Sequence, residues 1–315
     1  MHLLDPKMMK RADLEAELTA ARIQVEKLSA QFASASRIAF YDSLTDLPNR
    51  HGYDRYVASL QSLSRTLEFQ VSLDHGRGGG LLVAQVDIDH FKSVNTMLTH
   101  FGGDMVLGQF AARLARSARL KVVEGEGAAK RCLASLMVQE YLIRCGMTGS
   151  DLVSRWGGEE FFCIFPLCYR DPSAAASVYD DADRIIKRIM DNIRREPMMV
   201  PVNNTTYEMI KRQVIGNPDY YYHDAKLIIN GQPQVALPIS ASIGYAVISW
   251  EEFTSRAEDD PAHLFRNVVD LMRRAKETGR NRAVTVRSTG YGSRAAIHVL
   301  EGRSLAKTDL AGMVR

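Results

Sequence analysis

The sequence has no apolar run of the roughly 18 residues that a membrane-spanning helix needs. Its opening stretch, MHLLDPK, also lacks the apolar core of a secretory signal peptide. Charge of one sign is not in excess, because 40 Lys and Arg face 37 Asp and Glu, which argues against a protein that coats a nucleic acid polymer. We therefore expect a cytoplasmic protein with no membrane segment in this chain, so that an upstream sensor or partner protein would have to lie outside it.

Cysteine is also scarce. The four cysteines form neither a CxxC pair nor a Cys/His cluster, which excludes a disulfide framework and a zinc site and leaves reduced thiols. What the chain does have is an ordinary globular composition, with 46% hydrophobic and 24% charged residues in 315. That is enough to bury the core of one large domain with extensions.

Residues 11–40 contain no Gly or Pro and predict one helix. Its apolar residues alternate at spacings of four and three, as in the seam of a two-stranded coiled coil. They are Leu14, Leu18, Ala21, Val25, Leu28, Phe32, Ala35 and Ala39. We favour a coiled-coil stalk that joins two copies of the chain; the alternative is a helix that lies on its own domain.

Beyond residue 40 the patterns of strands and helices alternate, which indicates an α/β or α+β fold. Strands are expected at 81–87, 152–156, 161–165, 239–247 and 282–286, with helices at 51–69, 105–120, 173–195 and 261–278. A further helix is expected near 129–145. Residues 196–235 read as irregular, and the tail after 288 is weakly patterned.

Two short segments carry carboxylates where they could meet. Asp87 and Asp89 end an apolar strand, and Gly157-Gly158 forms a hairpin signal just before Glu159 and Glu160. Adjacent glycines let a ligand approach bare backbone. If the two segments lie side by side, Asp87 faces a glutamate, and a few hard oxygen ligands suit Mg²⁺.

Two other clusters are polar. Lys276 and Arg280 are four residues apart, which predicts one helix face that could clamp phosphates. Asn95 and Asp104 follow the first strand. Each cluster alone has an ordinary explanation as a cap, a hairpin or a solvated helix face, but all of them in this order argue for a site.

Five blocks together resemble the GGDEF family of diguanylate cyclases. They are DSLTDLPNR at 42–50, DIDHFKSVN with THFGGD across 87–104, RWGGEEF at 155–161, SIG at 242–244 and AKETGRN at 275–281. The resemblance spans about 42–287 and implies an α+β, palm-like nucleotidyl cyclase fold, with a central, mainly antiparallel sheet flanked by helices. We divide the chain into an N-terminal helix at 1–40, a catalytic domain at 41–290 with insertions near 121–147 and 197–234, and a C-terminal tail at 291–315.

The chain departs from the family's pattern in a few places. Asp46 and Thr99 stand where the family usually has glycine, and Thr96 where it usually has Asp. The family's product-inhibition motif, RxxD, would place its Arg at Thr148 and its Asp at Asp151, so only the Asp is present.

The resemblance implies a Mg²⁺-dependent enzyme, with Mn²⁺ as a substitute, that joins two GTP into cyclic di-GMP. In the family's pattern Asp87, Glu159, Glu160 and the Ile88 carbonyl hold metal, and Glu160 is a metal ligand or helps deprotonate the 3′-hydroxyl. Phosphates are bound by Phe91, Lys92, Lys276 and Arg280 and pass Gly157 and Gly158, while guanine is read by Asn95 and Asp104.

A carboxylate at Asp104 favours GTP over ATP, because it accepts from the guanine N1–H and 2-amine that adenine lacks. One domain holds one GTP, so the resemblance implies a homodimer. Three alternatives remain: a silent module that binds GTP or cyclic di-GMP as a receptor, a related cyclase with another product, and a scaffold whose function is the coiled coil.

Overall fold

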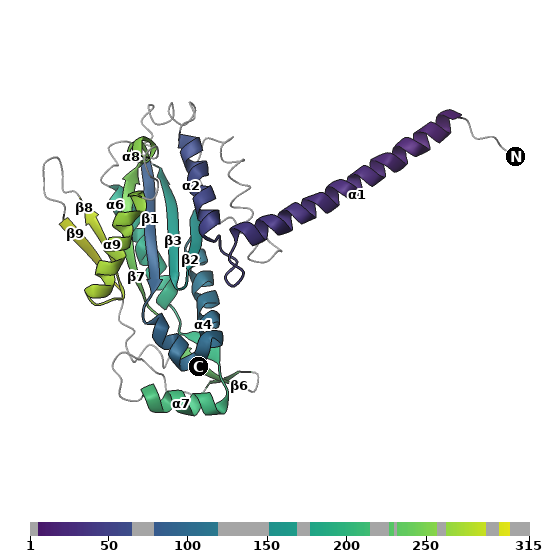
Figure 1. Cartoon of the computed structure of the whole chain (residues 1–315). Coiled ribbons are helices and arrows are strands. Elements are labelled where there is room, and N and C mark those ends of the chain that lie inside the picture. The colour runs from purple at the N-terminus through teal and green to yellow at the C-terminus, as the bar shows by residue number, and fades with distance from the viewer. Residues whose placement is uncertain are drawn as a thin grey trace.

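The computed structural model describes residues 6–64, 79–118, 151–168, 177–214, 227–229, 232–256, 263–287 and 296–302. At its centre is a six-stranded sheet with the order β2-β3-β1-β7-β8-β9 (Figure 1). The strands are β1 (Gly79–Ile88), β2 (Leu152–Gly157), β3 (Glu160–Cys168), β7 (Ala241–Ser249), β8 (Arg282–Arg287) and β9 (Ala296–Glu301). Only β7 and β8 run parallel, so the mainly antiparallel α+β sheet is confirmed.

Helices cover both faces of this sheet. They are α2 (Arg50–Ser64), α4 (Phe91–Arg116), α6 (Ser177–Arg194), α8 (Trp250–Arg256) and α9 (His263–Glu277). Side chains alternate across a strand, and in β1 Leu82 and Val86 share one core with α4 and α6. Leu81 and Val83 join the other core, with α2, α8 and α9. Burial on both faces explains why β1 reads as a continuous apolar run.

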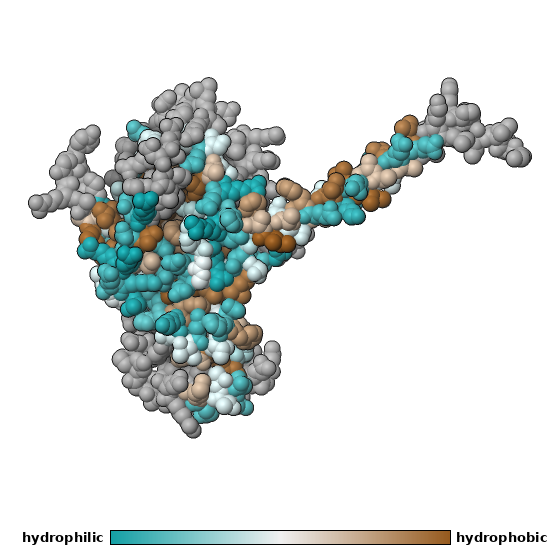
Figure 2. Space-filling view, in the orientation of Figure 1, coloured by the Kyte–Doolittle hydropathy of each residue, from teal (hydrophilic) through white to brown (hydrophobic). Residues whose placement is uncertain are grey.

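Helix α1 (Pro6–Phe40) projects from the domain as a single arm (Figure 1). Apolar side chains recur along it and are exposed to solvent (Figure 2). Exposed fractions are 64% for Leu14, 61% for Val25 and 72% for Phe32. The helix therefore does not lie on its own domain in this structure. No helix within the described residues combines the length and apolarity required to cross a membrane.

A second, smaller sheet lies in the segment that we expected to be irregular, so that expectation was wrong. It has the order β4-β6-β5, formed by β4 (Met198–Pro201), β5 (Leu227–Ile229) and β6 (Gln232–Leu237), with α7 (Asn204–Val214) between β4 and β5. Met198 pairs with Leu237, so the two ends of the insertion lie side by side. The Gln109 side chain of α4 bonds both backbone groups of Met199, at 2.8 and 3.1 Å.

Strand β9 lies in the segment that the sequence assigned to a tail, and it pairs with β8 along its whole length. Of its residues only Leu300 is buried, so the strand carries little of the buried/exposed alternation by which a sequence reveals a strand. A polar cluster also ties it to α6. There Asp183 accepts hydrogen bonds from Tyr245 (2.7 Å) and Arg287 (2.5 Å) and lies 3.0 Å from His298 of β9. The helix expected near 129–145 lies outside the described residues.

Candidate functional site

Asp87 and Glu160 face each other where the central strands end. Their Cα atoms are partners in the antiparallel ladder of β1 and β3, so both side chains leave the same face of the sheet. That face is the one covered by α9. The sequence prediction that Asp87 meets a glutamate of the hairpin is confirmed.

Asp87 is a buried carboxylate with one close cation. Its side chain is 3% exposed, and the Lys276 ammonium lies 2.8 Å from its Oδ1. Burial raises the pKa of Asp87 to about 6, against the opposing effect of Lys276, and the nearby charges of Glu159 and Glu160 raise it further. Extra positive charge at this position would therefore be favourable.

Gly244 on β7 allows α9 to come close enough for the contact between Lys276 and Asp87. A Cβ at this position would lie 2.2 Å from the Val268 carbonyl oxygen and 2.3 Å from the Met272 nitrogen. Both are backbone atoms of α9, so no side chain can be accommodated. The glycine of the SIG block thus sets the distance between the helix and the sheet.

Asp89 has a different role from Asp87, although the sequence presented them as a pair. Its carboxylate accepts hydrogen bonds from the Ser240 and Ser242 hydroxyls, both at 2.6 Å, and from the Asn281 backbone N–H at 2.9 Å. It therefore joins the end of β1 to the start of β7 and to the turn after α9. We assign Asp89 to the structure of the site rather than to its chemistry.

The hairpin tip is bare backbone beside open space. Gly158 has a φ of 53°, which favours glycine. A Cβ on Gly157 or Gly158 would meet nothing within 4 Å. Glu159 lies in the turn, where its carbonyl accepts from the Ile88 N–H at 3.4 Å. The tip thus leaves room for a ligand against the backbone.

A hydrated divalent cation fits this donor set. Among the described residues no group of three or more His, Cys, Asp or Glu converges as a metal site. Mg²⁺ is commonly bound by one or two carboxylates together with substrate phosphates. Asp87 and Glu160, with Glu159 in the adjoining turn, supply carboxylates of this kind.

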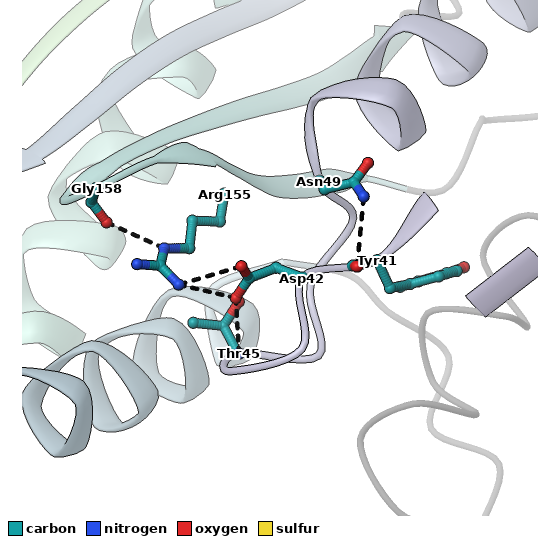
Figure 3. A network of polar contacts seen from close by, with 6 residues as sticks. All are labelled: Tyr41, Asp42, Thr45, Asn49, Arg155 and Gly158. Atoms are coloured by element: carbon teal, nitrogen blue, oxygen red, sulfur yellow. Dashed lines mark hydrogen bonds and ion pairs between the residues drawn. The ribbon is translucent and has the colours of Figure 1, made fainter. Parts of the chain in front are cut away.

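Arg155 connects the hairpin to the loop that follows α1 (Figure 3). Its guanidinium donates to both carboxylate oxygens of Asp42, at 3.0 and 3.1 Å, and to the Gly158 carbonyl at 3.0 Å. Burial would raise the pKa of Asp42, but hydrogen bonds from Thr45 and Arg155 outweigh it and lower that pKa. We had not given either residue a role, although both lie within blocks that the sequence singled out.

Asn95 and Asp104 both lie on α4, whose two halves meet at a kink. Thr99 forms the kink with φ 62° and ψ 178°. A Cβ on Gly103 would lie 1.9 Å from Asn95 Oδ1, so Asn95 rests against the backbone next to Asp104. The helix also begins earlier than expected, at Phe91, and the kink explains why its pattern could be followed only after 104.

The expected helical clamp of Lys276 and Arg280 was wrong in its geometry. Helix α9 ends at Glu277, and Gly279, Arg280 and Asn281 all have positive φ. Arg280 is exposed in this turn rather than stacked one helical turn after Lys276. At the N-terminus of α4, Phe91 is buried and Lys92 is exposed. The Ser93 N–H donates to the His90 carbonyl at 2.9 Å, and the N–H groups of Phe91 and Lys92 precede the first bonds of the helix.

Part of the chain is similar to known proteins. Residues 39–125 match the sequence model of the family described as "Diguanylate cyclase, GGDEF domain". The likeness to the GGDEF family therefore covers part of this chain. The match includes the Asp42 loop, β1 and α4, while the hairpin lies beyond it.

Curated relatives share part of the length of this chain. Diguanylate cyclase DgcP of Pseudomonas aeruginosa is 34% identical over 41% of the chain and 13% of that protein. Diguanylate cyclase VdcA of Vibrio cholerae is 26% identical over 68% of the chain and 52% of that protein. The P. aeruginosa protein named cyclic di-GMP phosphodiesterase NbdA is 29% identical over 48% of the chain and 14% of that protein. The chain thus spans at most about half the length of these three relatives.

A solved structure is also similar to this chain. The coiled coil and GGDEF domain of DgcB from Caulobacter crescentus matches with a TM-score of 0.48 and 21% identity, covering 86% of this chain and 97% of that one.

Proposed function

We propose that this chain is a diguanylate cyclase, which condenses two GTP into cyclic di-GMP and releases two pyrophosphates. The observation that carries the proposal is Asp87 opposite Glu160, beside Lys276 and below a glycine hairpin with open space. Carboxylates and a cation around bare backbone suit a triphosphate that brings its own divalent metal. The match of residues 39–125 to the GGDEF family model supports the same activity.

The metal would be held by Asp87, Glu159 and Glu160, with the Ile88 carbonyl as a further oxygen. Mg²⁺ or Mn²⁺ bound there would neutralise the triphosphate and polarise the α-phosphate. Lys276 is already in the site and would exchange its contact with Asp87 for the β/γ phosphates. Arg280 would contribute from the adjoining turn, and the first-turn N–H groups of Phe91 and Lys92 would bind phosphate oxygens.

Guanine would be read by Asn95 and Asp104. The packing of Asn95 against Gly103 brings its amide next to the position of Asp104. A carboxylate there accepts from both guanine N–H groups that adenine lacks, so ATP would leave it unpaired. Glu160 would accept the proton of the 3′-hydroxyl or hold metal.

Each domain would bind one GTP, so two copies have to face each other. The exposed seam of α1 would hold them together as a homodimeric coiled coil. Tethering would raise the effective concentration of one catalytic domain near the other to the millimolar range. The signal would come from a partner or from a segment outside this chain.

The deciding experiment is mass spectrometry of the products after incubation with GTP or ATP and Mg²⁺. We expect cyclic di-GMP from GTP, no cyclic product from ATP, and none from Glu159→Ala. Binding of GTP without any product would instead identify a silent receptor. A cyclic product other than cyclic di-GMP would identify a different cyclase.

A further inference from the structure

Gln85 is a buried polar residue on β1 with no role in the mechanism above. Its side chain is 2% exposed, and it lies two residues before Asp87, hence on the same face of the sheet. Its ladder partners are Phe162 on β3 and Gly244 on β7. Since α9 packs on Gly244, Gln85 lies beneath the helix that carries Lys276.

The amide of Gln85 has only half of its polar groups satisfied. Its Nε2 donates to Glu160 Oε1 at 3.3 Å. Its Oε1 is buried and has no hydrogen-bond partner among the described residues. A buried carbonyl without a partner is costly, and an apolar residue at this position would avoid that cost.

We propose that Gln85 is a positioning residue of the metal site. Its N–H group holds the Glu160 carboxylate opposite Asp87, and its carbonyl accepts a hydrogen bond from a water in the hydration shell of the cation. Mg²⁺ and Mn²⁺ retain such waters, and residues that orient metal ligands from outside the first shell typically contribute 10–100-fold to metal affinity. The inference rests on the metal site of the proposed function.

The test uses the full chain and Mn²⁺, with the free ion followed by electron paramagnetic resonance. Titrations are made with the metal alone and with 3′-deoxy-GTP, which lacks the attacking hydroxyl and therefore cannot react. Gln85→Leu and Gln85→Met remove the amide and keep most of its volume. Thr285→Val is the matched control, because Thr285 is also buried in this sheet with an unpartnered hydroxyl, two strands from β1.

We expect Mn²⁺ to bind about tenfold more weakly to both Gln85 variants and unchanged to Thr285→Val, with no fall in melting temperature in any of them. Wild-type Mn²⁺ affinity in both Gln85 variants would overturn the proposal. So would weaker binding accompanied by a lower melting temperature in both, because Gln85 would then be structural.

The cyclase assignment and the Gln85 proposal can fail independently of each other. A wild-type chain that binds Mn²⁺ in a Gln85-dependent way but forms no cyclic di-GMP would overturn the cyclase assignment and leave Gln85 in place. Cyclic di-GMP synthesis by a chain whose Mn²⁺ affinity does not depend on Gln85 would support the cyclase assignment and overturn the Gln85 proposal. A wild-type chain that binds no Mn²⁺ under either condition would remove both.

Discussion

Asp87 and Asp89 are two residues apart and serve different purposes, which their substitutions should separate. Asp87→Asn is expected to reduce turnover below a tenth of wild type, because it removes a proposed metal ligand. It should also stabilise the metal-free protein at pH 8 by up to about 3 kcal/mol. The raised pKa of Asp87 means that the folded state disfavours the ionised carboxylate. The extra stability of Asp87→Asn over wild type should therefore be absent below about pH 4 and grow as the pH rises from about 4 to 6.

The check is urea unfolding in EDTA at pH 4, 6 and 8, beside a turnover assay. Asp89→Asn is the control and should instead destabilise the fold by roughly 1–3 kcal/mol, since it weakens three charge-assisted hydrogen bonds. Equal losses of stability in the two variants would show that our division of their roles is wrong.

Thr99 has a backbone conformation that glycine adopts more easily, at a position where the family usually has glycine. Thr99→Gly should stabilise the protein by about 1 kcal/mol, as relief of the strain exceeds the extra entropy of the unfolded chain. Thr96→Gly, in the regular first half of the same helix, should destabilise it by roughly 0.5 kcal/mol. Urea unfolding of both variants is the measurement; a loss at both positions would argue against strain at Thr99.

Product inhibition should be weak, because Thr148 stands where the inhibitory motif has Arg. A hydroxyl has no charge and cannot form the bidentate phosphate contact of a guanidinium. Thr148 and Arg144, an arginine nearby in the chain, lie outside the described residues, and Asp151 is buried. Steady-state assays with added cyclic di-GMP test this. Potent non-competitive inhibition that disappears in Asp151→Ala would refute it.

At the scale of elements, Arg155 ties the loop after α1 to the glycine hairpin. Arg155→Lys should lower turnover about tenfold, because lysine cannot bond Asp42 twice and Gly158 at once. Arg37→Lys is the matched control: Arg37 pairs with Asp46 at 2.6 Å on the exposed side of the same loop, and its substitution should change little. Steady-state turnover of both variants is the measurement, and equal effects would mean that the hairpin does not depend on this contact.

Elements with strong periodicity were predictable, and those held by tertiary contacts were not. The long apolar run and the hairpin glycines correctly predicted β1 and the turn between β2 and β3. By contrast, β9 has one buried residue and depends on Asp183 in α6, a partner far away in the chain. Arg280 was misplaced because the positive φ angles at the end of α9 leave no periodic signal. Asp89 and Gln85 could not be interpreted without their partners across the sheet.

For the molecule as a whole, the projecting α1 should act through local concentration. Deletion of residues 1–40 should lower specific activity at low protein concentration and much less at high concentration. Activity measured across a dilution series is the check, with sedimentation velocity to follow dimers. Specific activity that does not depend on concentration after the deletion would rule out the stalk.

The pairing of Met198 with Leu237 has a consequence for how this chain can change. The two ends of this insertion are already hydrogen-bonded to each other. A longer chain between them should therefore cost the protein little stability. Val202 donates to the Pro233 carbonyl at 2.8 Å, just beyond the paired strands. A foreign sequence could therefore be inserted in the chain beyond Val202 without disturbing the six-stranded sheet.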